Sequence, residues 1–144
     1  MIVGVPTETF PGERRVALTP AVLSPLSKNG IEALVEKGAG LEAGYLDRDF
    51  TDKGAIIAAT RAEVFEKADV IAQVRALGAN PDAGASDLEL LREGQVVVGT
   101  CEPLTSHDQT RALADKGVTL LSLELMPRIT RAQSMDVLSS MATI

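Results

Sequence analysis

Four polar residues near the end of the chain have the types and spacing of a binding site: Arg128, Gln133, Asp136 and Ser139. A Pro-Arg pair at 127–128 leads into a pattern that predicts an amphipathic helix, on which the last three share one broad face with Ser140. Such groups can hold a sugar hydroxyl, a phosphate or an amide. A polar helical face is usually only solvated, but this one directly follows a predicted strand, where α/β proteins bind ligands, and this favours a binding role.

Short apolar runs alternate with helical patterns along the rest of the chain. Strands are predicted at 2–5, 32–36, 55–58, 70–74, 95–99 and 118–123. Helices are predicted at 20–29, from 47, at 60–67, after 86 and at 106–116. This alternation predicts an α/β fold with a doubly wound, mostly parallel, Rossmann-like or flavodoxin-like sheet in three layers, and places 96–98 in a central strand.

Local patterns predict how some helices and loops are built. Thr60 with Glu63 and Ser86 with Glu89 fit the capping-box pattern, and Ser106 is expected to cap the last helix. Residues 75–85 are expected to form a mobile loop. Because ligands of doubly wound sheets bind beyond the carboxyl ends of the strands, the functional loops are expected at 6–15, 37–46, 75–85, 100–105 and 124–133.

Composition excludes several classes of protein. Apolar residues make up 45% of the 144 residues and aromatic residues only 3%, so Val, Leu, Ile and Ala must form the core, as suits buried parallel strands. A net charge of −6 argues against nucleic-acid binding, which needs a basic face. The lone Cys101 excludes an internal disulfide and fits a reducing compartment. Without a signal peptide or an apolar run near the about 20 residues that span a bilayer, a cytoplasmic chain with no direct membrane insertion is expected.

The weaker candidates each have a plain structural interpretation. The glycine-rich segment 38–44 has the spacing G-x-G-x-x-x-G and no helix start inside it, so turns with positive φ are preferred to phosphate binding. Arg15 either clamps a carboxylate or phosphate or pairs with nearby glutamates, and both interpretations stay open. His107 is expected on the surface, Cys101 as a small buried residue, and no metal site is expected.

Several motifs coincide with those of a known family. They are Gly4-Val5-Pro6-Thr7-Glu8, the run from Glu13 to Pro20, Leu26 with Lys28 and Gly30, the run from Glu36 to Gly40, Ala43-Gly44-Tyr45 and Gly54-Ala55. Over essentially its whole length the chain resembles the N-terminal part of the alanine dehydrogenase and nicotinamide nucleotide transhydrogenase family. It departs from the family pattern at Gly12, where Asn is frequent, and around residues 21–23.

Two positions favour the transhydrogenase branch of this family. Alanine dehydrogenases have a Val-Lys-Glu-Pro motif and a His after the fifth strand, and both serve the amino acid. Here these places are Val74-Arg75-Ala76 and Thr100-Cys101-Glu102-Pro103, so that only Arg15 remains, as the family's carboxylate-binding arginine. The segment 127–136, in contrast, is similar to the motif of the NAD(H)-binding component of transhydrogenases.

The resemblance also implies a role for each polar residue of the C-terminal segment. In the family, the residues that match Arg128, Gln133 and Asp136 form a loop over the nicotinamide, and the match of Ser139 contacts the same end of NAD(H). Gln133 and Asp136 are therefore the predicted catalytic residues, and all four are predicted to bind the cofactor. Hydride transfer between two nicotinamides needs near-attack geometry and exclusion of water rather than an acid–base pair.

The resemblance finally implies an organisation and partners. Residues 1–125 would form the α/β domain, and 126–144 would begin an interdomain loop and helix leading to an NAD-binding Rossmann domain that the chain lacks. The chain would be inactive alone. At full length a homodimer is expected, held at the inner membrane by the NADP(H)-binding and membrane-embedded subunits of a proton-translocating transhydrogenase. An alanine dehydrogenase-like fragment and a stand-alone, non-catalytic binding module are the alternatives.

Overall fold

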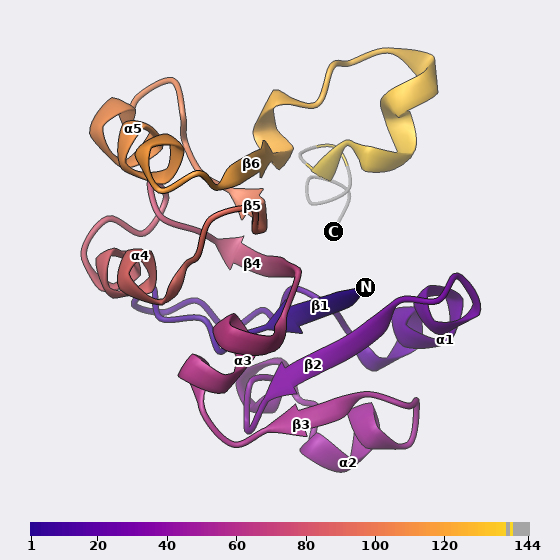
Figure 1. Cartoon of the computed structure of the whole chain (residues 1–144). Helices are drawn as coiled ribbons and strands as arrows, with labels where there is room; N and C mark the ends of the chain where they lie inside the picture. The colour runs from indigo at the N-terminus through magenta and orange to yellow at the C-terminus, as the bar shows by residue number, and fades with distance from the viewer. Residues whose placement is uncertain (138, 140–144) are drawn as a thin grey trace.

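The strands build one all-parallel sheet in the computed structural model, which describes residues 1–137 and 139 (Figure 1). The strands are β1 (Ile2–Val5), β2 (Glu32–Glu36), β3 (Ile56–Ala58), β4 (Val70–Arg75), β5 (Val96–Thr100) and β6 (Thr119–Ser122). The helices are α1 (Pro20–Lys28), α2 (Asp47–Thr51), α3 (Arg61–Lys67), α4 (Asp87–Leu90) and α5 (His107–Asp115). Short 3-10 helices are η1 (Leu41–Ala43), η2 (Ala83–Ser86), η3 (Leu123–Leu125) and η4 (Thr130–Met135).

The strand order is β3-β2-β1-β4-β5-β6, with every neighbouring pair parallel. The chain therefore winds outward from β1 to one edge, returns to β4 and winds outward to the other edge. This is the predicted doubly wound sheet, and its switch point lies between β1 and β4. β5 lies between β4 and β6, so residues 96–98 are inside the sheet as predicted.

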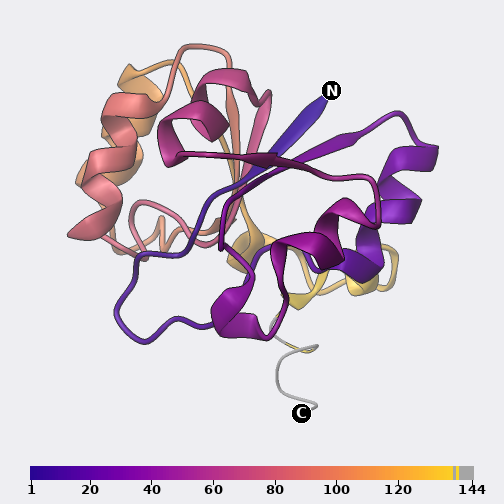
Figure 2. The same cartoon turned by 90° about the horizontal axis from the view of Figure 1, so that it is seen from below.

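Helices cover both faces of the sheet, which gives the predicted three layers (Figures 1 and 2). Alternate residues of β2 divide between two buried clusters: Leu34 belongs to one, and Ala33 and Val35 to the other. The Leu34 cluster includes Phe65 of α3 and Leu113 of α5, whereas the second cluster includes Phe50 of α2 and a residue of α1. Both faces of the strand are apolar, as expected for a parallel sheet.

The predicted helix caps have mixed outcomes. The Thr60 cap is confirmed, since its side chain accepts a hydrogen bond from the Glu63 amide at 3.2 Å. The Ser86 capping box is wrong, because the 3-10 helix η2 runs directly into α4 and leaves Ser86 in a helical conformation, with its hydroxyl donating to the Ala83 carbonyl. Ser106 stands at the start of α5, but its hydroxyl donates to the Gly78 carbonyl instead of capping the helix.

The first half of the segment expected to be a mobile loop, 75–85, is instead packed into the molecule. Residues 76–80 are buried, and the Asn80 amide donates to Thr9 Oγ1 at 2.8 Å. Gly78 has φ +108, and a Cβ there would lie 2.0 Å from the Cys101 carbonyl oxygen. Close backbone contact with the end of β5 therefore requires glycine at this position and fixes the segment.

The continuous amphipathic helix predicted after Arg128 is wrong. Residues 130–135 form the 3-10 helix η4, and Asp136 interrupts it in an extended conformation. The Asp136 carboxylate accepts hydrogen bonds from the amide and the hydroxyl of Ser139, at 3.0 and 2.6 Å, and Val137 and Ser139 are helical. An aspartate that caps a following helix does not continue the preceding one. Ser140, which the sequence pattern groups with these residues, lies outside the described residues.

Within the part of the chain that the structure describes, no helix is long and apolar enough to cross a membrane.

Candidate functional site

The four polar residues singled out in the C-terminal segment line one small pocket. Its volume is about 290 Å³, and its walls are Arg128, Ile129, Thr130, Gln133, Asp136 and Ser139. The bend at Asp136, rather than a common helical face, brings these side chains together. Ala132 is only 4% exposed, so η4 is covered on one side. The predicted grouping is therefore present, although the predicted local structure is not.

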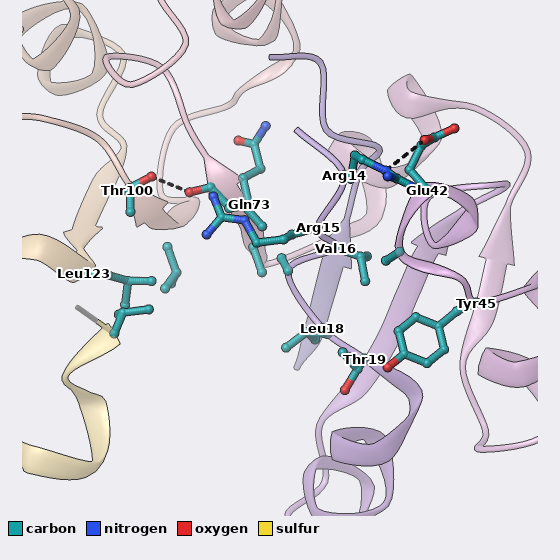
Figure 3. Close-up of a pocket in the computed structure, with 16 residues that line it drawn as sticks. Arg14, Arg15, Val16, Leu18, Thr19, Glu42, Tyr45, Gln73, Thr100 and Leu123 are labelled. Carbon is teal, nitrogen blue, oxygen red and sulfur yellow. Dashed lines mark hydrogen bonds and ion pairs between the residues drawn. The ribbon is translucent and has the colours of Figure 1, made fainter. Parts of the chain in front are cut away.

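A larger pocket of about 670 Å³ lies over the ends of β4 and β5 (Figure 3). Its floor consists of Ala72, Val74 and Val98, on the sheet face opposite to that of their buried neighbours Ile71 and Val97. The chain from Arg14 to Thr19, together with Glu42, Ala43 and Tyr45, forms one wall, and Leu123 and Val137 contribute to the other. Val137 lines this pocket and the preceding residue lines the smaller one, so the two pockets flank the same turn of the chain.

Arg15 lines the larger pocket and also pairs with a glutamate. Its Nε and Nη2 atoms donate to the two carboxylate oxygens of Glu13 at 2.7 and 2.6 Å. Arg14 is 3.6 Å from Glu42, with both side chains 75% exposed. Pairing with nearby glutamates is thus present for both arginines, while the position of Arg15 in the pocket wall leaves it able to meet a ligand (Figure 3).

Glu13 joins Arg15 to a second arginine, Arg75. The Arg75 Nε donates to Glu13 at 3.2 Å, and its guanidinium lies 4.3 Å from the centre of the Phe10 ring. The aromatic face and the carboxylate together hold this cation at the end of β4. Arg75 is therefore engaged by the loop after β1.

Glu8 fixes the same loop to the sheet. The pairing of β4 with β5 is irregular between Ala72 and Arg75, which leaves backbone amides without strand partners. The Glu8 carboxylate accepts hydrogen bonds from the amides of Val74 and Arg75, at 2.6 and 3.1 Å. Burial raises the pKa of Glu8, and these two hydrogen bonds oppose the rise.

A buried network around Arg61 completes the support of this loop, and sequence reasoning missed it. Arg61 Nε and Nη2 each donate to Asp87 at 2.6 Å, and Nη1 donates to the Thr7 carbonyl at 2.7 Å. The Gln73 amide donates to Asp87 at 3.0 Å. Such partners are far apart in sequence, and only the fold brings them together.

The pairing of Glu13 makes stability depend on pH. The hydrogen bond from Arg15 holds the pKa of Glu13 at about 2, below the ordinary value of 4.5. The unfolded chain therefore takes up this proton first as the pH falls, and the stabilisation, complete above about 4.5, is lost towards about 2. As the pH falls from about 4.5 to about 2, we expect the urea concentration at the unfolding midpoint to decrease more steeply in the wild type than in Glu13→Gln. Parallel curves for the two proteins would contradict this assignment.

The remaining sequence candidates have structural roles. Gly38 and Gly44 have φ values of +81 and +87, as expected for turns, whereas Gly40 has a negative φ and is required because a Cβ would lie 2.5 Å from the Phe50 ring. Cys101 is 1% exposed, as predicted, and burial raises the pKa of its thiol to about 12. His107 is on the surface, as predicted.

The doubly wound parallel sheet with helices on both faces defines a Rossmann-like α/β domain. The family described as "Alanine dehydrogenase/PNT, N-terminal domain" matches residues 4–144. The chain belongs to this family, whose members are oxidoreductases.

Three known proteins illustrate the relationship. In Rhodospirillum rubrum, the protein that forms the first portion of the NAD(P) transhydrogenase subunit alpha is 40% identical over all 144 residues, which span 37% of it. The alanine dehydrogenase of Methanococcus maripaludis is 34% identical over the same residues, 36% of its length. The crystal structure of transhydrogenase from Sinorhizobium meliloti superposes with a TM-score of 0.89 at 38% identity, covering 99% of this chain and 40% of that one. The chain thus spans well under half of these relatives.

Proposed function

We propose that this chain is the N-terminal part of the NAD(H)-binding α subunit of a proton-translocating NAD(P) transhydrogenase. The observation that carries the proposal is the pocket in which Arg128, Gln133, Asp136 and Ser139 meet. Identity reaches 40% over the whole chain with a transhydrogenase α subunit and 36% over 124 residues with an alanine dehydrogenase, which supports the same branch. In this proposal the four residues contact the nicotinamide end of NAD(H).

The residues of this pocket fit such a cofactor. Arg128 supplies charge-assisted donors for a phosphate or carboxamide oxygen, and Gln133, which is exposed, offers both a donor and an acceptor to a second nucleotide. Asp136 fixes the turn through Ser139, so the polar groups are held before any ligand binds. NAD(H) supplies the hydride, while these residues orient the rings and exclude water. Gln133 and Asp136 are the proposed catalytic residues.

The proposed assembly extends beyond this chain. Residues 1–125 form the proposed α/β domain, and 126–144 begin the connection to an NAD-binding Rossmann domain. NADP(H) is bound by a partner subunit, and a membrane-embedded partner carries the proton-translocating step, so the α subunit is peripheral to the inner membrane. A homodimer of the full-length subunit is part of the proposal, as is the inactivity of residues 1–144 alone.

A second candidate function is the deamination of alanine. It is favoured by Arg15, which lines the larger pocket where an amino-acid carboxylate would need a cation. Against it, Arg75 is occupied by Glu13 and Phe10, and Thr100-Cys101-Glu102-Pro103 contains no histidine. A deaminase would need another group to receive the proton of the substrate amine.

Reduction of an NADP analogue by NADH tests the proposal. The full-length protein, combined with NADP-binding and membrane-embedded transhydrogenase subunits, is expected to catalyse this reaction and to show no alanine-dependent NADH formation above background. Calorimetry is expected to detect far weaker NADH binding to residues 1–144 than to the full-length protein. Robust alanine-dependent NADH formation would replace the proposal with the second candidate.

A further inference from the structure

The segment that carries the candidate cofactor pocket is anchored at its start by one carboxylate. Glu124, in η3, accepts hydrogen bonds from the backbone amides of Cys101 and Glu102, at 2.7 and 2.5 Å. Its second oxygen accepts from the Ser122 hydroxyl. Two successive amides directed at one oxygen form a concave anion-binding site, which here is filled by a side chain of the same chain.

The backbone just after β5 adopts an unfavourable conformation at this contact. Glu102 has φ +47 and is the only non-glycine residue with positive φ among those described. Non-glycine side chains adopt this left-handed conformation at a cost, and it persists only where surrounding contacts hold it. The two hydrogen bonds to Glu124 are such contacts, because the amides of Cys101 and Glu102 both donate to its carboxylate.

The anchor is linked to the pocket by a short and stiff piece of chain. Glu124 is followed by Leu125 and Met126, and Pro127 then restricts its own φ and the conformation of Met126. Arg128 follows immediately. Four residues span at most about 14 Å, so Arg128 cannot lie further than this from Glu124, and a displacement of Glu124 is expected to move Arg128 as well.

The neighbours of Glu124 are fixed on two sides. Leu123 contributes to the wall of the larger pocket over β4 and β5, while Leu125 and Met126 line a separate hollow beside β6. Leu125 is nevertheless 51% exposed, so apolar burial holds this turn only in part. The hydrogen bonds of Glu124 therefore decide where the following segment starts. Burial tends to raise the pKa of Glu124, but the hydrogen bonds from Ser122 and the backbone amides outweigh it and lower the pKa, which keeps the anchor ionised at neutral pH.

We propose that Glu124 is a positioning residue. By accepting hydrogen bonds from the amides of Cys101 and Glu102, it fixes the segment 126–136. Arg128 and Gln133 are thereby held against the nicotinamide. This inference rests on the proposed function for the identity of the ligand. The hydrogen bonds that anchor the segment are present in this chain whatever the ligand is. Glu124 does not touch the cofactor in this proposal. It acts through the geometry of the residues that do.

Single-turnover hydride transfer at saturating NADH tests the role in the full-length protein assembled with its partner subunits. Glu124→Ala is expected to slow the transfer about tenfold or more, because small misplacements of positioning groups are costly, with a smaller change in the Kd for NADH. Glu124→Gln keeps an oxygen that can accept both amide hydrogen bonds and should recover most of the rate. Glu89→Ala, an exposed glutamate of α4, is the matched control and should behave as the wild type. A rate for Glu124→Ala equal to this control would overturn the inference, as would a Gln variant no better than the Ala variant.

Nuclear magnetic resonance of residues 1–144 separates the anchor from the function. Glu124→Ala should shift the amide signals of Cys101 and Glu102 and the side-chain signals of Arg128 and Gln133, whereas Glu89→Ala should leave all four in place. Unshifted Arg128 and Gln133 signals would refute the anchoring even if activity fell. If the wild-type assembly transfers no hydride, the proposed function fails, and these shifts still decide whether Glu124 holds the segment.

Discussion

Asp87→Ala is expected to lower the free energy of unfolding by about 3–5 kcal/mol, the cost of breaking a buried ion pair from one side. The Asp87 side chain is 3% exposed and that of Arg61 is 18% exposed. Removing the carboxylate leaves a guanidinium with two donors directed into the interior, and it also removes the acceptor of Gln73. The loss comes mainly from the stranded charge, because the pair itself stabilises the fold little relative to apolar residues of similar size.

Urea unfolding of single and double variants tests this explanation. Replacing both partners, as in Arg61→Met with Asp87→Leu, should be much less harmful than the sum of the two single changes, because neither member of the buried pair is left alone. Glu36, which lies 3.6 Å from Arg61, keeps its hydrogen bond from the Thr7 amide. Lys67→Ala, which removes an exposed partner of Glu63, should leave the unfolding midpoint nearly unchanged. Additive losses in the double variant would mean that packing, and not charge, dominates at Asp87.

The same network connects stability to the candidate site. Arg61 donates to the Thr7 carbonyl, and Glu8, one residue further on, is bound to the end of β4. The loop that carries Glu13 and Arg15 is thus attached to the sheet by buried polar contacts in addition to the packing of Val16 in the core. Variants at Asp87 should therefore disturb this loop as well as the stability of the fold.

The sheet was predictable because its signal is local. Buried parallel strands are short apolar runs bounded by turn residues, and no boundary of the six predicted strands differs from the observed one by more than one residue. Gly30 and Gly117, at φ +72 and +73, directly follow the helices predicted at 20–29 and 106–116. Such features need no knowledge of what lies across the fold.

The supporting contacts were not predictable, since their partners are far apart in sequence. Glu8 meets Val74 across 66 positions, and Arg61 meets Asp87 across 26. The charges of Glu8 and Arg61, which follow predicted strands, could have marked these two residues as candidates. No local sequence pattern, however, identifies the residues that they contact. In the C-terminal segment the helical periodicity wrongly predicted one continuous helix, because Asp136 fits the periodic pattern but caps a new helix. The types and spacing of the residues indicated the segment, the family resemblance implied the role of each residue, and only the structure shows the bend that brings them together.

Gln133→Asn is expected to slow hydride transfer about a hundredfold while changing the Kd for NADH much less. The substitution keeps the amide and shortens its reach by one methylene, so it tests a contact to the second nucleotide and not the charge that binds NADH. Arg128→Ala should act in the opposite sense, weakening NADH binding by about 1.5–3 kcal/mol through loss of a charge-assisted contact. Asp136→Asn removes the charge but leaves a good helix cap, so the segment should keep its shape.

Stopped-flow rates and separately measured NADH affinities, both on the assembled full-length protein, distinguish these roles. Gln109→Asn makes the same chemical change on α5, outside the pocket, and should leave rate and affinity as in the wild type. Because Gln133 is exposed, its shortening should not unfold the segment, and a slow rate with unchanged NADH affinity would identify a contact made mainly in the transition state. If Asp136 also orients Arg128, the two changes should be non-additive. Near wild-type rates in all three variants would mean that this pocket is only a solvated bend in the chain and that the nicotinamide lies elsewhere.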